Sequence, residues 1–300
     1  MKVLVTGGTV FVSRYCTEYF VRQGHEVYVL NRNTRPQSSG VKLIECDRHC
    51  IGDRLKKHYF DVVMDITGYN ERDVSDLVSA LGGYGRYFFI SSSAVYPETA
   101  PQPFRESQPC GVNIHWGDYG TNKIAAERFL LDNVEKLYII RPPYLYGKMN
   151  NLYREAFVFE CAENDLPFYV PGSGEMPLQF FDVNDLCRFI DVLLEKQPDQ
   201  RGFNVGNPNT LTVSEWVRAC YAVLGKEPEL RSVADHDPQR WFCFRDYAYS
   251  LDVSSQQTLM PDLKLLSDGL RESYEWYAAH RGEVRRKDYL SYIIDNIEEM

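Results

Sequence analysis

Short apolar runs alternate with longer amphipathic segments through the first half of the chain. The runs predict strands at Lys2–Val5, Glu26–Leu30, Lys42–Glu45, Val62–Asp65, Tyr87–Ser91 and Leu137–Arg141. Helices are predicted between them where apolar residues recur at helical spacing, as at Val12, Cys16, Tyr19 and Phe20. Strands that alternate with helices are typical of a parallel sheet covered on both faces.

The alternation weakens after Gly147, where the chain becomes more aromatic. One more helix is predicted over Asp185–Glu195, a returning strand over Phe203–Val205 and a final helix over Tyr289–Ile297. The sequence therefore predicts an α/β fold, a doubly wound parallel Rossmann sheet with a smaller mixed α/β C-terminal domain. We expect residues 1–147 and about 178–206 to bind a dinucleotide, and residues 148–177 and 207–300 to cap the substrate.

The acidic balance of the chain narrows the choice of partner. Of 300 residues, 42 are Asp or Glu and 33 are Lys or Arg, so the net charge is −9. This balance disfavours a nucleic acid or an anionic membrane as partner. No apolar run has the length of a membrane span. The eight cysteines are scattered, which is typical of a reduced, cytoplasmic protein.

Only two cysteines, Cys46 and Cys50, lie close together, and His49 stands between them. Zinc sites of the finger type need a second ligand pair at a fixed spacing. No such pair follows in this sequence. We therefore predict no metal site.

A glycine-rich turn follows the first predicted strand. Thr6-Gly7-Gly8-Thr9 leads into Val10, Phe11 and Val12 at the start of the first helix. Glycine lets the backbone approach a pyrophosphate, and the N-terminus of a helix directs N–H groups at it. Val10 and Ser13 replace two of the three glycines of the dinucleotide fingerprint. The motif alone is therefore also compatible with a turn that binds no ligand.

The end of the second strand bears on the choice of cofactor. Asn31 and Arg32 stand there with Arg35 close behind, and the acidic residue that would bind the ribose 2′-hydroxyl of NAD is missing. An arginine suits the 2′-phosphate, so NADP is favoured over NAD. The alternative is that both arginines are solvated loop charges. Asp47, after the third strand, is placed to accept from the adenine amino group, and we assign Arg48 to the same site.

Tyr119 and Lys123 share one face of a predicted helix, because they are four residues apart. An ammonium beside a phenol favours the phenolate, so the tyrosine can exchange a proton nearer neutral pH. Tyr144 and Lys148 have the same spacing, but two prolines before them and a glycine between them predict a loop. The serine run at 91–93 ends the fifth strand, where a hydroxyl can hydrogen-bond a substrate oxygen or simply form a turn.

Four motifs follow one another along the chain. They are Thr6-Gly7-Gly8-Thr9-x-Phe11, Ser91-Ser92-Ser93-Ala94-Val95-Tyr96, Tyr119-x-x-x-Lys123 and Arg141-Pro142-Pro143-Tyr144-Leu145-Tyr146-Gly147. Together they resemble the extended short-chain dehydrogenases/reductases, the NAD-dependent epimerase/dehydratase group. The similarity continues through Pro171–Gly174, Phe181–Asp185, Phe203–Gly206 and Gly269–Tyr277, so it covers nearly the whole chain.

This resemblance implies roles for three side chains. The Tyr119 phenol is the acid/base, Lys123 lowers its pKa and binds the nicotinamide ribose, and Ser92 is the catalytic hydroxyl. It implies an NAD(P)-dependent oxidoreductase or epimerase/dehydratase that transfers hydride on a small carbonyl, alcohol or sugar-derived substrate. A homodimer is the family's commonest assembly. The expected cofactor site comprises Gly7, Gly8, Thr9, Val10, Phe11, Val12, Asn31, Arg32, Arg35, Asp47, Arg48, Lys123 and Pro142.

Two positions depart from the family's pattern. Members that act on nucleotide sugars carry an arginine that clamps the diphosphate where this chain has Leu178, and a glutamine where it has Met176. The stretch 178–186 looks more like an atypical branch, which includes reductase-like proteins and relatives of chloroplast stem-loop RNA-binding proteins. Two alternatives to an enzyme therefore stay open. One is a non-catalytic NAD(P)-binding regulatory protein, and the other is an RNA-binding protein, which the acidic charge disfavours.

Overall fold

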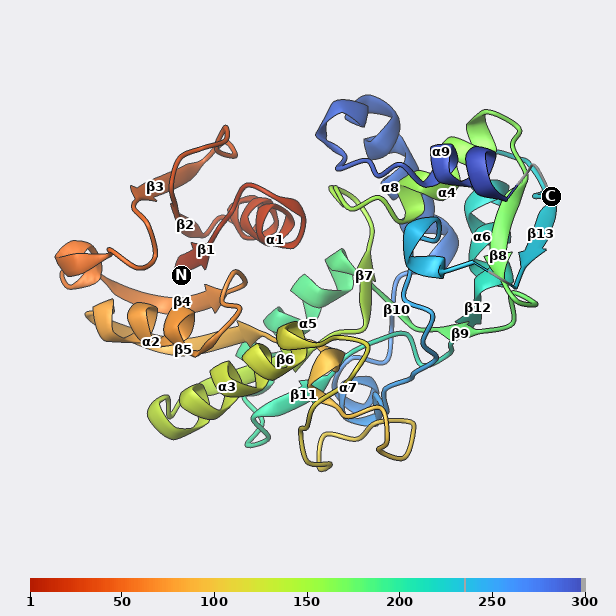
Figure 1. Cartoon of the computed structure of the whole chain (residues 1–300). Coiled ribbons are helices and arrows are strands. Elements are labelled where there is room, and N and C mark those ends of the chain that lie inside the picture. The colour runs from red at the N-terminus through yellow and green to blue at the C-terminus, as the bar shows by residue number, and fades with distance from the viewer. Residues whose placement is uncertain (235, 298–300) are drawn as a thin grey trace.

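A seven-stranded parallel sheet forms the centre of one half of the molecule (Figure 1). The computed structural model describes residues 1–234 and 236–297. Its strands lie in the order β11-β6-β5-β4-β1-β2-β3. Their bounds are β1 Lys2–Thr6, β2 Glu26–Asn31, β3 Val41–Glu45, β4 Tyr59–Asp65, β5 Gly83–Ile90, β6 Leu137–Arg141 and β11 Gly202–Asn204. The predicted doubly wound α/β fold is confirmed.

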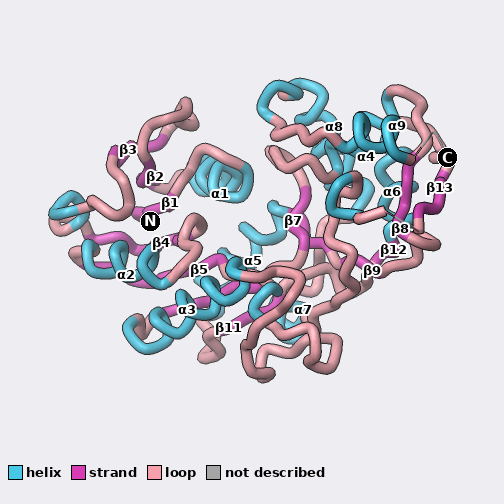
Figure 2. Tube along the Cα trace, in the orientation of Figure 1, coloured by secondary structure: helices cyan, strands magenta, loops and turns pink. Residues whose placement is uncertain are grey.

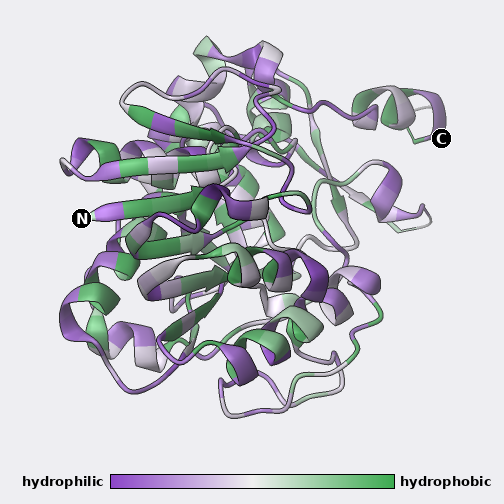
Figure 3. Ribbon diagram, turned by 90° about the vertical axis from the view of Figure 1, so that its left-hand side faces the viewer, coloured by the Kyte–Doolittle hydropathy of each residue, from purple (hydrophilic) through white to green (hydrophobic). Residues whose placement is uncertain are grey.

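Helices cover both faces of this sheet. On one face α1 (Phe11–Arg22) packs beside α5 (Val183–Lys196), and on the other α2 (Glu71–Ala80) packs beside α3 (Asp118–Asn133). The strands carry the apolar side chains that hold these layers together, as their green colour in Figure 3 shows. The strand order reverses between β1 and β4, and a sheet of this kind binds ligands in the crevice at that point.

The C-terminal part of the chain forms smaller sheets and helices beside the carboxyl ends of the strands (Figure 2). Three strand pairs occur there: β7 Tyr144–Tyr146 with β10 Phe180–Asp182, β8 Phe168–Pro171 with β13 Leu230–Val233, and β9 Pro177–Leu178 with β12 Leu211–Thr212. The helices are α4 Glu155–Glu163, α6 Val213–Val223, α7 Ser254–Leu259, α8 Leu266–Ala279 and α9 Tyr289–Asn296. The chain returns to the large sheet through β10, α5 and β11. The predicted domain limits stay a prediction.

One local prediction was wrong. Tyr144 lies in strand β7 and not in a loop, because the segment beyond the two prolines pairs with β10, 36 positions later at Phe180↔Tyr144. Such a pairing is long-range and leaves no trace in the local sequence.

Among the described residues, none of the helices has the length and apolar character that crossing a membrane requires.

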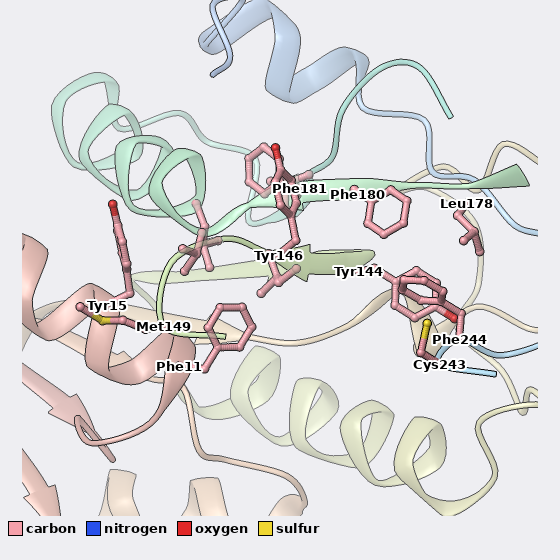
Figure 4. Close-up of a cluster of buried hydrophobic side chains, with 14 of the residues drawn as sticks. Phe11, Tyr15, Tyr144, Tyr146, Met149, Leu178, Phe180, Phe181, Cys243 and Phe244 are labelled. Carbon is pink, nitrogen blue, oxygen red and sulfur yellow. The ribbon is translucent and has the colours of Figure 1, made fainter. Parts of the chain in front are cut away.

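Aromatic side chains fill the junction between the large sheet and the C-terminal part. Phe180 stacks on Trp216 with ring centroids 3.6 Å apart, and Tyr144 meets Phe244 edge-on at 5.0 Å. Leu178 is buried against the same cluster (Figure 4). Well-packed rings of this kind are rigid, so the junction fixes how the C-terminal segments stand over the carboxyl ends of the strands.

Candidate active site

A cavity of about 620 Å³ lies at the carboxyl ends of the central strands. Its wall combines the turn after β1, the segments after β4, β5 and β6, the start of α3 and side chains from the C-terminal part. Of the residues predicted for the site, it contains Gly7, Thr9, Val10, Phe11, Val12, Ser92, Tyr119, Lys123 and Pro142. The tertiary structure therefore brings together four motifs that lie far apart in the sequence.

The turn after β1 has the geometry of a phosphate-binding turn. Gly7 and Gly8 have φ of +89° and +85°, and a Cβ on Gly8 would lie 2.5 Å from Cγ1 of Val29. Helix α1 follows with Val10 as N-cap, but no side chain caps it and its first turn holds no acidic residue. The first N–H groups of α1 are thus free to bind an anion, because no intrahelical acceptor exists for them.

The two missing glycines of the fingerprint do not disturb this turn. Val10 has an extended backbone (φ −140°), which any residue adopts. The Ser13 hydroxyl donates to the Val10 carbonyl oxygen at 2.8 Å and closes the turn from within. The residues present therefore fit the pyrophosphate of a dinucleotide.

The residues predicted to hold the adenosine end lie outside this cavity. The Asn31 amide donates to the Gly7 carbonyl at 2.6 Å and so supports the phosphate-binding turn. Arg32 and Arg35 are exposed in the loop after β2. The Asp47 carboxylate accepts from the His49 backbone N–H at 2.9 Å. The roles expected of these residues stay predictions.

Arg48 makes hydrogen bonds in the interior that the sequence did not predict. Its guanidinium donates to both carboxylate oxygens of Asp65, at 3.2 and 3.0 Å, and to the Asp73 carbonyl at 2.8 Å. Asp65 in turn accepts from Thr6 and Tyr87. The Arg48 side chain therefore ties β1, β4, β5 and α2 together, whereas the sequence predicted contact with the cofactor, which stays untested.

Tyr119 stands in the first turn of α3 and lines the cavity. Gly120 allows this helix to approach closely, because a Cβ there would lie 2.5 Å from the Ala94 carbonyl oxygen. That approach brings Tyr119 to the serine run. Burial raises the pKa of the Tyr119 phenol, and a hydrogen bond with Ser92 and the charge of Arg154 lower it.

The structure distinguishes between the three serines. The Ser91 hydroxyl donates to the Glu127 carboxylate and is therefore engaged away from the cavity. Ser93 hydrogen-bonds Tyr249, and this bond opposes the rise that burial causes in the pKa of that phenol. Ser92 is the one that faces Tyr119, and its Oγ accepts from the Ala94 N–H at 3.2 Å. Its position therefore supports the choice of Ser92.

Lys123 is buried, with 1% of its surface exposed. Its ammonium donates to the carbonyl oxygens of Gly68 and Ile90, both at 2.7 Å. Burial lowers the pKa of Lys123 to about 8, against the charges of Asp65 and Glu127, which raise it. An ammonium has three donors. These two bonds leave one of them for a further acceptor at the cavity wall.

Sequence reasoning missed several residues of the cavity wall, among them every arginine and asparagine that lines it. Asn151, Arg154, Arg245 and Arg285 line it from the C-terminal part. They are spread over more than a hundred positions and form no motif, so no signal in the sequence could have grouped them. Trp116 also lines the cavity.

The chain resembles known proteins over nearly its full length. It is 28% identical over 302 residues to the chloroplast stem-loop binding protein of 41 kDa b from Arabidopsis thaliana, covering 91% of this chain and 78% of that one. It is 26% identical over 229 residues to probable GDP-L-fucose synthase 1 from Oryza sativa subsp. japonica, covering 69% of this chain and 66% of that one.

Solved structures share the fold. UDP-glucose 4-epimerase from Thermotoga maritima has a TM-score of 0.77 at 20% identity, covering 93% of this chain and 99% of that one. UDP-glucuronic acid 4-epimerase from Bacillus cereus, solved with UDP-glucuronic acid and NAD, has a TM-score of 0.73 at 18% identity, with the same coverage of each chain.

A sequence model of the NAD dependent epimerase/dehydratase family matches residues 3–206, which is more than half of the chain. This match contains the glycine turn, the serine run and the Tyr119–Lys123 pair. The predicted resemblance is thus confirmed. The chain belongs to the NAD-dependent epimerase/dehydratase family and is an NAD(P)-dependent enzyme of the short-chain dehydrogenase/reductase type.

Proposed function

We propose that this protein transfers hydride reversibly between a pyridine nucleotide and a carbinol carbon of a sugar-derived substrate, with Tyr119 as the acid/base. One observation carries this proposal. Tyr119, Ser92 and Lys123 line the same cavity as the uncapped N-terminus of α1. A dinucleotide whose pyrophosphate lies on that N-terminus extends along the cavity toward these three side chains.

Each side chain of the site has its own proposed role, which follows from its position. The Tyr119 hydroxyl donates or accepts the proton of the reacting oxygen. Ser92, its neighbour, holds that oxygen by a hydrogen bond and so orients the reacting carbon. When bound, the nicotinamide supplies or takes up the hydride.

Burial raises the pKa of the Tyr119 phenol above its ordinary value, and the hydrogen bond with Ser92 and the charge of Arg154 oppose that rise. Lys123 donates to two carbonyl oxygens, and we assign its remaining N–H to the nicotinamide ribose. A lower pKa of the phenol brings proton exchange nearer neutral pH. The proposed role of Lys123 is therefore mainly to bind the ribose, while Ser92 and Arg154 limit the rise in the pKa of Tyr119.

We propose NADP as the preferred cofactor. The loop after β2 presents Arg32 and Arg35, both exposed, and no acidic residue takes the place that would bind a 2′-hydroxyl. Mass spectrometry of nucleotides released from the purified protein tests this. NADP in the released fraction is expected, and NAD alone contradicts it.

The acid/base role is tested with Tyr119→Phe. We expect unchanged affinity for the cofactor and turnover reduced by about 10²- to 10⁴-fold on any sugar derivative that the wild type converts. Tyr59→Phe, at an exposed tyrosine of β4 outside the cavity, is the matched control. Full turnover in Tyr119→Phe rejects the role, and a protein that binds no pyridine nucleotide rejects the proposed function as a whole.

The proposal also includes a cytoplasmic location and a homodimer. Light scattering of the purified protein tests for the homodimer.

An RNA-binding role is the weaker alternative. It rests on one relative named for stem-loop binding, whereas this chain carries a net charge of −9. Retention of structured RNA at physiological salt would revive it.

A further inference from the structure

Three arginines from the C-terminal part line the cavity: Arg154, Arg245 and Arg285. The same three line a second cavity of about 400 Å³, which shares six wall residues with the first and adds Lys287. Neither wall contains an aspartate or a glutamate. The whole chain has a net charge of −9, so a cavity wall that carries cations and no carboxylate differs from the rest of the protein.

These arginines are not paired with carboxylates, although Arg245 donates to the amide oxygen of Gln239 at 2.8 Å. Within residues 1–234 and 236–297, no carboxylate lies within 4.0 Å of any of the three guanidinium groups. By contrast, Arg281 and Arg286, on the same C-terminal segment as Arg285, pair with Glu163 and Glu160. Three cations are thus left to attract a charge that the protein does not supply.

A buried amide without a partner lies in the same wall. Asn151 is 5% exposed and lines the cavity, and its Nδ2 has no hydrogen-bond partner among the described residues. The Arg285 N–H donates to the Asn151 carbonyl at 2.9 Å, so this segment runs beside the segment that carries Arg154. Leaving a buried donor unpaired is costly, which points to an acceptor that the ligand brings.

Two of the cations act on tyrosines of the cavity wall. Arg154 lies 4.8 Å from the centre of the Tyr144 ring, and burial raises the pKa of Tyr144 and Tyr119 while the Arg154 charge opposes that rise. Burial also raises the pKa of Tyr69, which lies in the same wall, and the Arg285 charge opposes it. In a nucleotide sugar, by contrast, the sugar ring separates the diphosphate from the reacting carbon. The position at which an arginine would clamp that diphosphate is Leu178, which is buried among aromatic rings (Figure 4).

Building on the proposed function, we propose that the substrate is a compact anion, a small carbon skeleton whose carboxylate or phosphate is held by Arg154, Arg285 and the Asn151 amide next to Tyr119. Arg245, which lies 5.7 Å from the centre of the Trp116 ring, lines the same pocket. A carboxylate and a phosphate both present a pair of acceptor oxygens, which an arginine guanidinium can bind through two parallel N–H bonds. The arginines thus predict a negative charge on the substrate, close to the reacting carbon.

The test measures anion binding and needs no knowledge of the substrate. Inorganic phosphate, malonate and UDP are titrated by calorimetry at constant ionic strength, into the protein with and without NADP. We expect saturable binding of phosphate or malonate, weakened about tenfold or more in the double variant Arg154→Met, Arg285→Met. The tighter of the two shows whether a phosphate or a carboxylate is preferred. Arg218→Met, at an exposed arginine of α6 outside both cavities, should bind as the wild type does.

Three outcomes would overturn the inference. They are the absence of saturable binding by either small anion, equal binding by the double variant with its fold intact by circular dichroism, and arginine-dependent binding of UDP that exceeds both small anions. The last would return the site to a nucleotide. A protein that binds phosphate at these arginines but no pyridine nucleotide would instead reject the proposed function and leave the anion site standing.

Discussion

Glu127 and Arg141 form a buried bidentate ion pair, with the guanidinium Nε 3.0 Å from one carboxylate oxygen and Nη2 2.6 Å from the other. Glu127 belongs to α3, the helix that carries Tyr119 and Lys123, and Arg141 ends β6. Arg141 also donates to the Tyr96 hydroxyl at 2.8 Å. The pair therefore attaches the helix of the acid/base to the carboxyl end of the sheet.

Removing one partner of this pair should destabilise the fold. Glu127→Ala leaves the Arg141 cation buried without a counter-charge, so we expect the free energy of unfolding to fall by about 3–5 kcal/mol. Urea unfolding measures it. Glu135→Ala, at an exposed position just past the end of α3, should change it by less than about 0.5 kcal/mol. Equal effects of the two substitutions would refute a stabilising role for the pair.

The phosphate-binding turn should tolerate no side chain at Gly8. In Gly8→Ala the new Cβ meets Val29 at 2.5 Å and the backbone keeps a positive φ, so we expect a loss of about 3 kcal/mol in stability and weaker cofactor binding. Gly24→Ala is the control, because Gly24 has φ of +78° with no atom within 4 Å of the added Cβ. It should lose only about 1 kcal/mol and bind the cofactor normally. Thermal unfolding and calorimetry give both quantities.

Asp182 makes the stability depend on pH. Burial raises the pKa of this carboxyl, the N-cap of α5, from 3.8 to about 7. Between these values the folded protein holds a proton that the unfolded chain has lost. Stability contributed by the neutral carboxyl is therefore present at low pH and is lost as the pH rises through about 7, on the order of 3 kcal/mol.

Asp182→Asn should remove this dependence, because asparagine can accept the same bond from the Asn184 N–H without titrating. Urea unfolding at about pH 5 and about pH 8 is the measurement, and Asp262→Asn, at an exposed loop position, is the control. A wild-type protein whose stability difference between the two pH values matches that of Asp182→Asn would speak against the raised pKa.

The choice of cofactor should depend on two exposed arginines. In the double variant Arg32→Ala, Arg35→Ala, we expect the affinity for NADP to fall about tenfold and that for NAD to stay, since only NADP carries the 2′-phosphate. Arg72→Ala on α2, whose side chain is 73% exposed, should alter neither. Calorimetric titration with both nucleotides decides this. Equal losses of affinity for NADP and NAD would show that the two arginines do not bind the 2′-phosphate.

Features that depend on neighbours along the chain could be read from the sequence. Alternating apolar runs gave the strands of the large sheet, because burial on both faces requires apolar side chains at nearly every position. The turn at Gly7 and Gly8 and the four-residue spacing of Tyr119 and Lys123 are also local. The strand order then follows from few topological choices, so the position of the crevice was predictable.

What the tertiary structure alone decided are contacts between distant segments. It placed Arg154 and Arg285 on one wall, directed Ser92 rather than Ser91 to Tyr119, and engaged Arg48 with Asp65 in the interior. Each of these depends on which groups are buried together and which donors find acceptors. That balance arises only when the whole chain is packed, and a single sequence carries no local sign of it.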